Sequence, residues 1–68
     1  MRLSARNQFA GTVVGMAPGA VNGSVKVEIG DGLVVTASIT EEAIAELGLA
    51  PGDRVTVIVK ASDVMIGK

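Results

Sequence analysis

The chain contains no cysteine and no histidine among its 68 residues. Their absence excludes a disulfide framework, a Cys/His zinc site, a thiol nucleophile and any acid–base pair built on histidine. In so short a chain, a single hydrophobic core contributes only a few kcal/mol to the free energy of unfolding. We therefore expect one domain over residues 1–68, stabilised by burial and by association with other chains.

Aromatic side chains are also nearly absent, since Phe9 is the only one. Even so, 49% of the residues are hydrophobic. A domain of this size buries only about 60% of the surface that its unfolded chain exposes. Much of the apolar surface of this chain would therefore stay exposed to water unless another chain covers it. We therefore predict self-association, and we assign Phe9 to the core or to a subunit interface.

No excess of positive charge is present, because six Lys and Arg face seven Asp and Glu, for a net charge of −1. This balance argues against general binding to nucleic acid or acidic membranes, and it disfavours a DNA-binding regulatory fragment. No apolar run approaches the roughly 18 residues of a membrane span, and the first residues do not resemble a secretion signal. The cytoplasm is the expected compartment.

The apolar residues alternate or form short β-branched runs, which is typical of strands. The pattern predicts five strands, over Gln8–Met16, Val21–Ile29, Leu33–Ile39, Arg54–Lys60 and Val64–Ile66. One short helix is predicted over Glu41–Leu47, with Thr40 as its N-cap and Gly48 just beyond its end. The expected fold is all-β: a small five-stranded Greek-key barrel like the oligonucleotide/oligosaccharide-binding (OB) fold, with one helix.

Catalytic machinery is not visible in the sequence. Glu41, Glu42 and Glu46 lie on the predicted helix without a nucleophile, base or metal partner, and we interpret them as a solvated face. Asp31 and Asp53 belong to turns. The glycines fit no phosphate-binding motif. We expect no enzyme activity and no organic cofactor.

Two polar stretches are rich in hydrogen-bond donors. They are Ser4, Ala5, Arg6 and Asn7 before the first predicted strand, and Lys60, Ala61 and Ser62 after the fourth. Guanidinium, ammonium, hydroxyl and backbone N–H groups together suit a tetrahedral oxyanion. On composition alone a simpler interpretation is favoured, in which the two serines are caps and the two cations are ordinary surface charges.

The same stretches, together with several others, closely resemble the molbindin (Mop) family of small cytoplasmic proteins that bind molybdate and tungstate. The resemblance spans essentially the whole chain, in the segments Met1–Gln8, Gly19–Asn22, Thr36–Thr40, Glu46–Leu49 and Val57–Ile66. It implies an OB-like fold assembled as a homo-hexamer, a trimer of dimers, that stores oxyanions at subunit interfaces.

By this resemblance, the main class of site takes its residues from two neighbouring subunits. One subunit would supply Ser4, Ala5, Arg6 and Asn7, and the other Lys60, Ala61 and Ser62. A second class would use mainly the backbone of Gly19, Ala20, Val21 and Asn22. None of these residues would ligate a metal cation directly. The main alternative is a structural or protein-interaction module without an oxyanion ligand.

Overall fold

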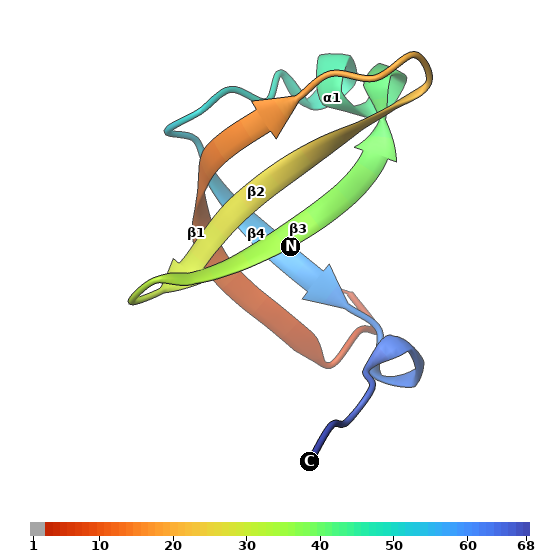
Figure 1. Ribbon diagram of the computed structural model, residues 1–68. Coiled ribbons are helices and arrows are strands. Elements are labelled where there is room, and N and C mark those ends of the chain that lie inside the picture. The colour runs from red at the N-terminus through yellow and green to blue at the C-terminus, as the bar shows by residue number, and fades with distance from the viewer. Residues whose placement is uncertain (1–2) are drawn as a thin grey trace.

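The structure is a computed structural model that describes residues 3–68, so the first two residues of the opening motif, Met1 and Arg2, lie outside it. The described chain forms one curled antiparallel sheet with a short helix at one end (Figure 1). Its elements are β1 (Asn7–Ala17), β2 (Asn22–Gly30), β3 (Leu33–Thr40), α1 (Glu41–Leu47), β4 (Arg54–Val59) and the one-turn 3₁₀ helix η1 (Ala61–Asp63).

The strand order is β3-β2-β1-β4, with every neighbouring pair antiparallel. Three strands follow one another through short connections and the fourth returns beside the first, which is the Greek-key order. The predicted topology is therefore confirmed for four strands. Within residues 3–68, β3 and β4 are the two unpaired edges of the sheet.

The predicted fifth strand, Val64–Ile66, is wrong. The chain turns through η1 after β4, and the residues beyond it are not paired with any strand of the described chain. Val64 has extended backbone angles, but Met65 and Ile66 are 92% and 89% exposed. A strand needs a neighbouring ladder for its backbone hydrogen bonds, and η1 directs this segment away from both sheet edges (Figure 1).

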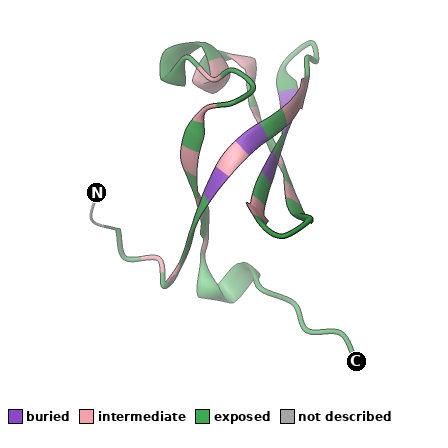
Figure 2. Ribbon diagram, turned by 90° about the vertical axis from the view of Figure 1, so that its left-hand side faces the viewer, coloured by how far each residue is buried: buried purple, intermediate pink, exposed green. Residues whose placement is uncertain are grey.

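The core is small and lies inside the curl of the sheet. Its buried hydrophobic side chains are Val13, Val25 and Val27, which lie on β1 and β2, where Figure 2 shows the buried positions. Seven half-buried residues pack against them: Met16, Ile29, Ile39, Ile44, Leu49, Val55 and Val57. Alternation along the strands places the strand residues of this core on the inner face, as the sequence predicts, while Ile44 comes from α1 and Leu49 from the connection that follows it.

Helix α1 has the predicted bounds because its ends carry local signals. The Thr40 hydroxyl accepts a hydrogen bond of 3.1 Å from the Ala43 N–H, which satisfies one of the unpaired donors of the first turn. Gly48 ends the helix with a left-handed φ of 62°. Ile44 anchors the helix on the core.

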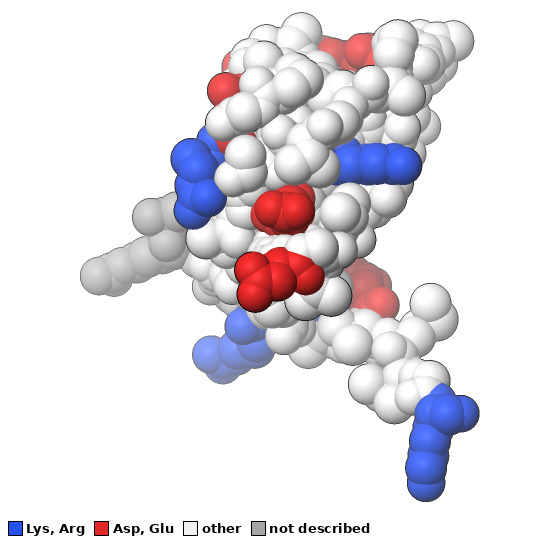
Figure 3. All heavy atoms as spheres, turned by 60° about the vertical axis from the view of Figure 1, so that its left-hand side comes forward, with Lys and Arg blue, Asp and Glu red and all other residues white. Residues whose placement is uncertain are grey.

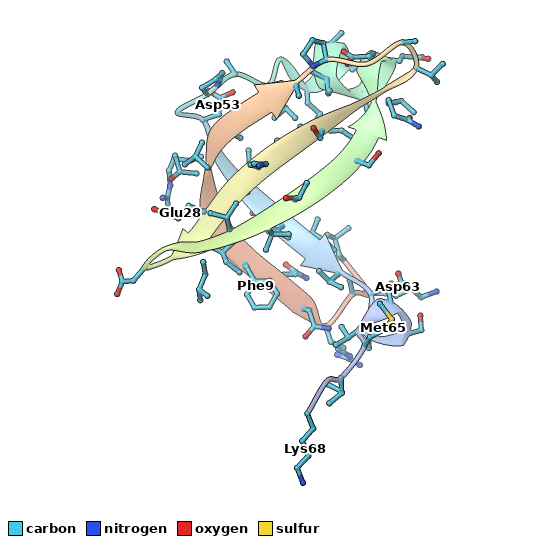
Figure 4. The ribbon with its side chains drawn as sticks, viewed as in Figure 1. Phe9, Glu28, Asp53, Asp63, Met65 and Lys68 are labelled. Carbon is cyan, nitrogen blue, oxygen red and sulfur yellow. The ribbon has the colours of Figure 1, made fainter. Side chains whose placement is uncertain are left out.

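Phe9 is 42% exposed, so it does not belong to the core of the single chain. Phe9 lies opposite Val57, which packs against the core, so its ring extends from the inner face of β1 but stays largely uncovered in the single chain (Figure 4). The predicted assignment of Phe9 to the core is therefore wrong for the single chain. Its alternative assignment, to a subunit interface, stays a prediction.

Candidate functional site

The pairing of β1 with β4 brings the two donor-rich stretches together at one end of the molecule. Asn7 lies opposite Val59 in the antiparallel register. Arg6, just before Asn7, and Lys60, just after Val59, are therefore the next residues on the two chains at this end of the ladder. The stretches are separated by more than fifty positions in the sequence, and only the Greek-key return of β4 makes them neighbours. The two stretches therefore lie side by side in one chain, whereas the resemblance implies that a single site takes them from two neighbouring subunits.

Two side-chain amides fix the shape of the N-terminal stretch. The Asn7 Nδ2 donates to the Val59 carbonyl at 3.1 Å, which ties this stretch to the end of β4. The Gln8 Nε2 donates to the Ala5 carbonyl at 3.0 Å and holds the backbone just before β1. Asn7 thus has a structural role here, and Gln8 is a positioning residue absent from the predicted set, although its amide follows the stretch directly.

The C-terminal stretch is shaped by η1. The Asp63 N–H donates to the Lys60 carbonyl at 2.8 Å, and the Val64 N–H donates to the Ala61 carbonyl at 3.3 Å. The N–H groups that open a helical turn have no partner inside it. Accordingly, the N–H groups of Ala61 and Ser62 make no hydrogen bond within residues 3–68.

The candidate site is open to solvent and carries two cations, Arg6 and Lys60. Within the predicted set, Ala5 and Asn7 are half-buried, and the exposed members are Ser4, Arg6, Lys60, Ala61 and Ser62. Over the face seen in Figure 3, acidic and basic side chains are interspersed and form no broad basic patch. Any attraction for an anion at this end would therefore be local, from the guanidinium, the ammonium and the nearby backbone N–H groups.

The predicted second segment lies at the other end of β1, in the β1–β2 connection (Figure 1). The two sets of residues therefore do not meet within one chain. The Gly19 N–H donates to the Glu41 carboxylate at 2.9 Å, and the Glu41 N–H donates to the Val21 carbonyl at 2.8 Å.

This contact corrects the interpretation of Glu41 as part of a solvated face. Its side chain is half-buried and paired with a backbone donor, whereas Glu42 and Glu46 are exposed as predicted. The partner lies 22 positions away in the sequence, so no local pattern could have revealed it.

The two larger hollows of the described chain lie away from both segments, whereas a smaller one of about 260 Å³ lies next to the second segment, lined in part by Ala17, Ser24 and Lys26. One of about 310 Å³ opens inside the curled sheet and is lined mainly by the apolar core residues. Another, of about 500 Å³, lies between Leu47, Arg54 and Ile58. Neither is lined by a predicted site residue.

Within residues 3–68, no group of three or more acidic side chains is placed to hold a metal ion. No helix of this part of the chain is long and apolar enough to cross a membrane.

The chain is similar to known proteins over nearly its whole length. The family model described as "TOBE domain" matches residues 3–66. Molybdenum-pterin-binding protein 2 of Clostridium pasteurianum is 44% identical over 66 residues, which cover 97% of each chain.

Solved structures agree with the fold. A molybdate-binding protein from Sporomusa ovata superposes with a TM-score of 0.93 at 35% identity, over 100% of both chains. The cytoplasmic molybdate-binding protein ModG, with molybdate bound, gives a TM-score of 0.91 at 46% identity. That match covers 96% of this chain and 46% of ModG. The chain therefore belongs to the TOBE domain family and, within it, to the molbindin (Mop) proteins.

Proposed function

We propose that this protein binds molybdate and tungstate reversibly and serves as an oxyanion store in the cytoplasm. The observation that carries the proposal is the meeting of the two donor-rich stretches at one end of the β1–β4 ladder. Similarity over nearly the whole of this chain to proteins described as binding molybdate supports the choice of ligand. No bond is made or broken, so the protein needs no catalytic residue and no organic cofactor.

Each ligand group has a distinct role in this proposal. Arg6 and Lys60 offset the double negative charge of the anion, and Ser4 and Ser62 donate hydroxyl hydrogen bonds. The backbone N–H groups of Ala61 and Ser62 donate further hydrogen bonds to the anion, because they have no partner within the described residues. Such donors bind anions without a metal or a base.

The proposed sites lie at the interfaces of a homo-hexamer built as a trimer of dimers. In a single chain the main site is exposed on one side, and a second subunit would enclose it. Large apolar side chains at the same end are also exposed, among them Val64, Met65 and Ile66. Contiguous exposed apolar residues are typical of surfaces that contact another protein.

Selectivity over sulfate would follow from size. Molybdate and tungstate are larger than sulfate at equal charge and shape, and a cage built partly from backbone N–H groups cannot contract freely. Sulfate then leaves some donors without a partner, which costs binding energy.

Isothermal titration of molybdate into the purified protein, in phosphate-free buffer, tests the proposal. Saturable binding that persists in a large excess of sulfate is the expected result, with tungstate equivalent to molybdate. Displacement by sulfate at similar concentrations would contradict the size argument. A defined oligomer that binds no oxyanion would favour a protein-interaction module instead.

A further inference from the structure

The β1–β2 connection is fastened to the start of helix α1 by two hydrogen bonds that involve the same residue. The Glu41 carboxylate accepts from the Gly19 N–H at 2.9 Å, and the Glu41 N–H donates to the Val21 carbonyl at 2.8 Å. A carboxylate oxygen thus already occupies one of the backbone donors of the proposed second class of oxyanion site.

Two glycines make this approach possible. A Cβ on Gly23 would lie 2.5 Å from the Glu41 Oε1 and 2.8 Å from the Ile44 Cδ1. A Cβ on Gly19 would overlap the carbonyl oxygen of Asn22. A side chain on Gly23 would therefore collide with the carboxylate, and one on Gly19 would push the connection away from Asn22, so the position of the carboxylate is fixed by packing as well as by hydrogen bonding.

The segment that holds this carboxylate carries no cation of its own to attract a second anion. The connection and the start of β2 contain no Lys or Arg between Ala17 and Val25. Within residues 3–68, the N–H groups of Ala20 and Val21 make no hydrogen bond and remain available as donors. An oxyanion that used these donors would approach the Glu41 carboxylate and compete with it for the Gly19 N–H. Two like charges at such short range repel each other.

We infer that Glu41 is an internal competitor that sets the oxyanion affinity of the Gly19–Asn22 segment. An ion can use the Gly19 N–H only when the carboxylate gives it up, and it meets the negative charge of Glu41 at short range, so this contact makes the second class of site weaker than the main class. The inference rests on the proposed function, because it concerns the same ligand at a second place in the chain.

The test removes the charge of Glu41 and keeps its shape. Glu41→Gln retains an oxygen that accepts from the Gly19 N–H, so the connection should keep its structure. Glu42→Gln is the matched control, since it makes the same change of net charge at an exposed neighbour on the same helix. Sodium molybdate is titrated into the ¹⁵N-labelled wild type and both variants, and the amide signals of Gly19, Ala61 and Ser62 are followed by NMR.

The expected result is half-saturation of the Gly19 shift at a molybdate concentration at least tenfold lower in Glu41→Gln than in the wild type and in Glu42→Gln. If the Gly19 signal of Glu41→Gln responds like that of Glu42→Gln, or less strongly, the inference is overturned. The Ala61 and Ser62 signals separate this outcome from failure of the proposed function. They respond in all three proteins if the main site exists and in none if it does not.

Discussion

At the scale of single residues, Arg6 and Lys60 supply the positive charge of the proposed main site. We expect Arg6→Ala and Lys60→Ala each to weaken molybdate binding by about thirtyfold to several thousandfold, since truncating one partner of a desolvated charge pair costs about 2–5 kcal/mol. Isothermal titration measures the change. Glu46→Ala is the control, because Glu46 is exposed on α1 and belongs to neither predicted segment. A loss of binding in Glu46→Ala with none in Arg6→Ala would show that the site is misplaced.

Gly11 is a second residue whose identity the structure explains. A Cβ there would lie 2.6 Å from the Val27 Cγ1 and 2.8 Å from the Glu28 carbonyl oxygen. Gly11→Ala should therefore lower the free energy of unfolding by about 1–3 kcal/mol, the usual cost of overpacking a core. Urea denaturation at fixed protein concentration provides the measurement. Gly15→Ala is the matched control, because its Cβ would find its nearest neighbour at 3.9 Å, and an equal loss in both variants would refute the packing explanation.

At the scale of elements, the short helix depends on its N-cap. Replacing Thr40 by Ala removes the hydroxyl that accepts from the Ala43 N–H, and we expect a loss of about 1 kcal/mol in unfolding free energy. Thr40→Ser keeps the hydroxyl and should recover most of the stability in the same thermal or urea assay. Equal destabilisation by both substitutions would mean that the Thr40 methyl group, and not the cap, matters.

Local signals explain which elements the sequence predicts well. The bounds of α1 follow from Thr40 and Gly48, and the inner face of β2 follows from alternation at Val25 and Val27. The segment Val64–Ile66 has the same β-branched and apolar character, yet it forms no strand in the described chain. Composition shows that a segment suits a sheet, whereas pairing depends on a partner edge that the local sequence does not specify.

The candidate site, too, could be predicted from the sequence only in part. The chemical character of the two donor-rich stretches is visible in the sequence, because Ser, Arg and Lys side chains are concentrated there. Their adjacency depends on the pairing of Asn7 with Val59, which is a consequence of the fold. The Gly19–Glu41 hydrogen bond also joins distant residues, so it too required the structure.

At the scale of the whole molecule, the exposed apolar C-terminal segment indicates an assembled state. Met65 is 92% exposed in the single chain, and Met65→Glu would place a charge in the proposed subunit contact. We expect this variant to sediment as a smaller species than the wild type. Lys68→Glu changes a charge near the same end and should leave the assembly intact. Unchanged sedimentation of Met65→Glu would show that this segment does not contribute to the interface.

The central claim is that the oxyanion binds where the ends of β1 and β4 meet. Crystals grown with tungstate and measured at the tungsten absorption edge would locate the ion directly by anomalous scattering. We predict strong anomalous density within hydrogen-bond reach of Arg6, Lys60 and the N–H groups of Ala61 and Ser62. Density elsewhere in the molecule, or none at this end of the ladder at saturating tungstate, would contradict the account.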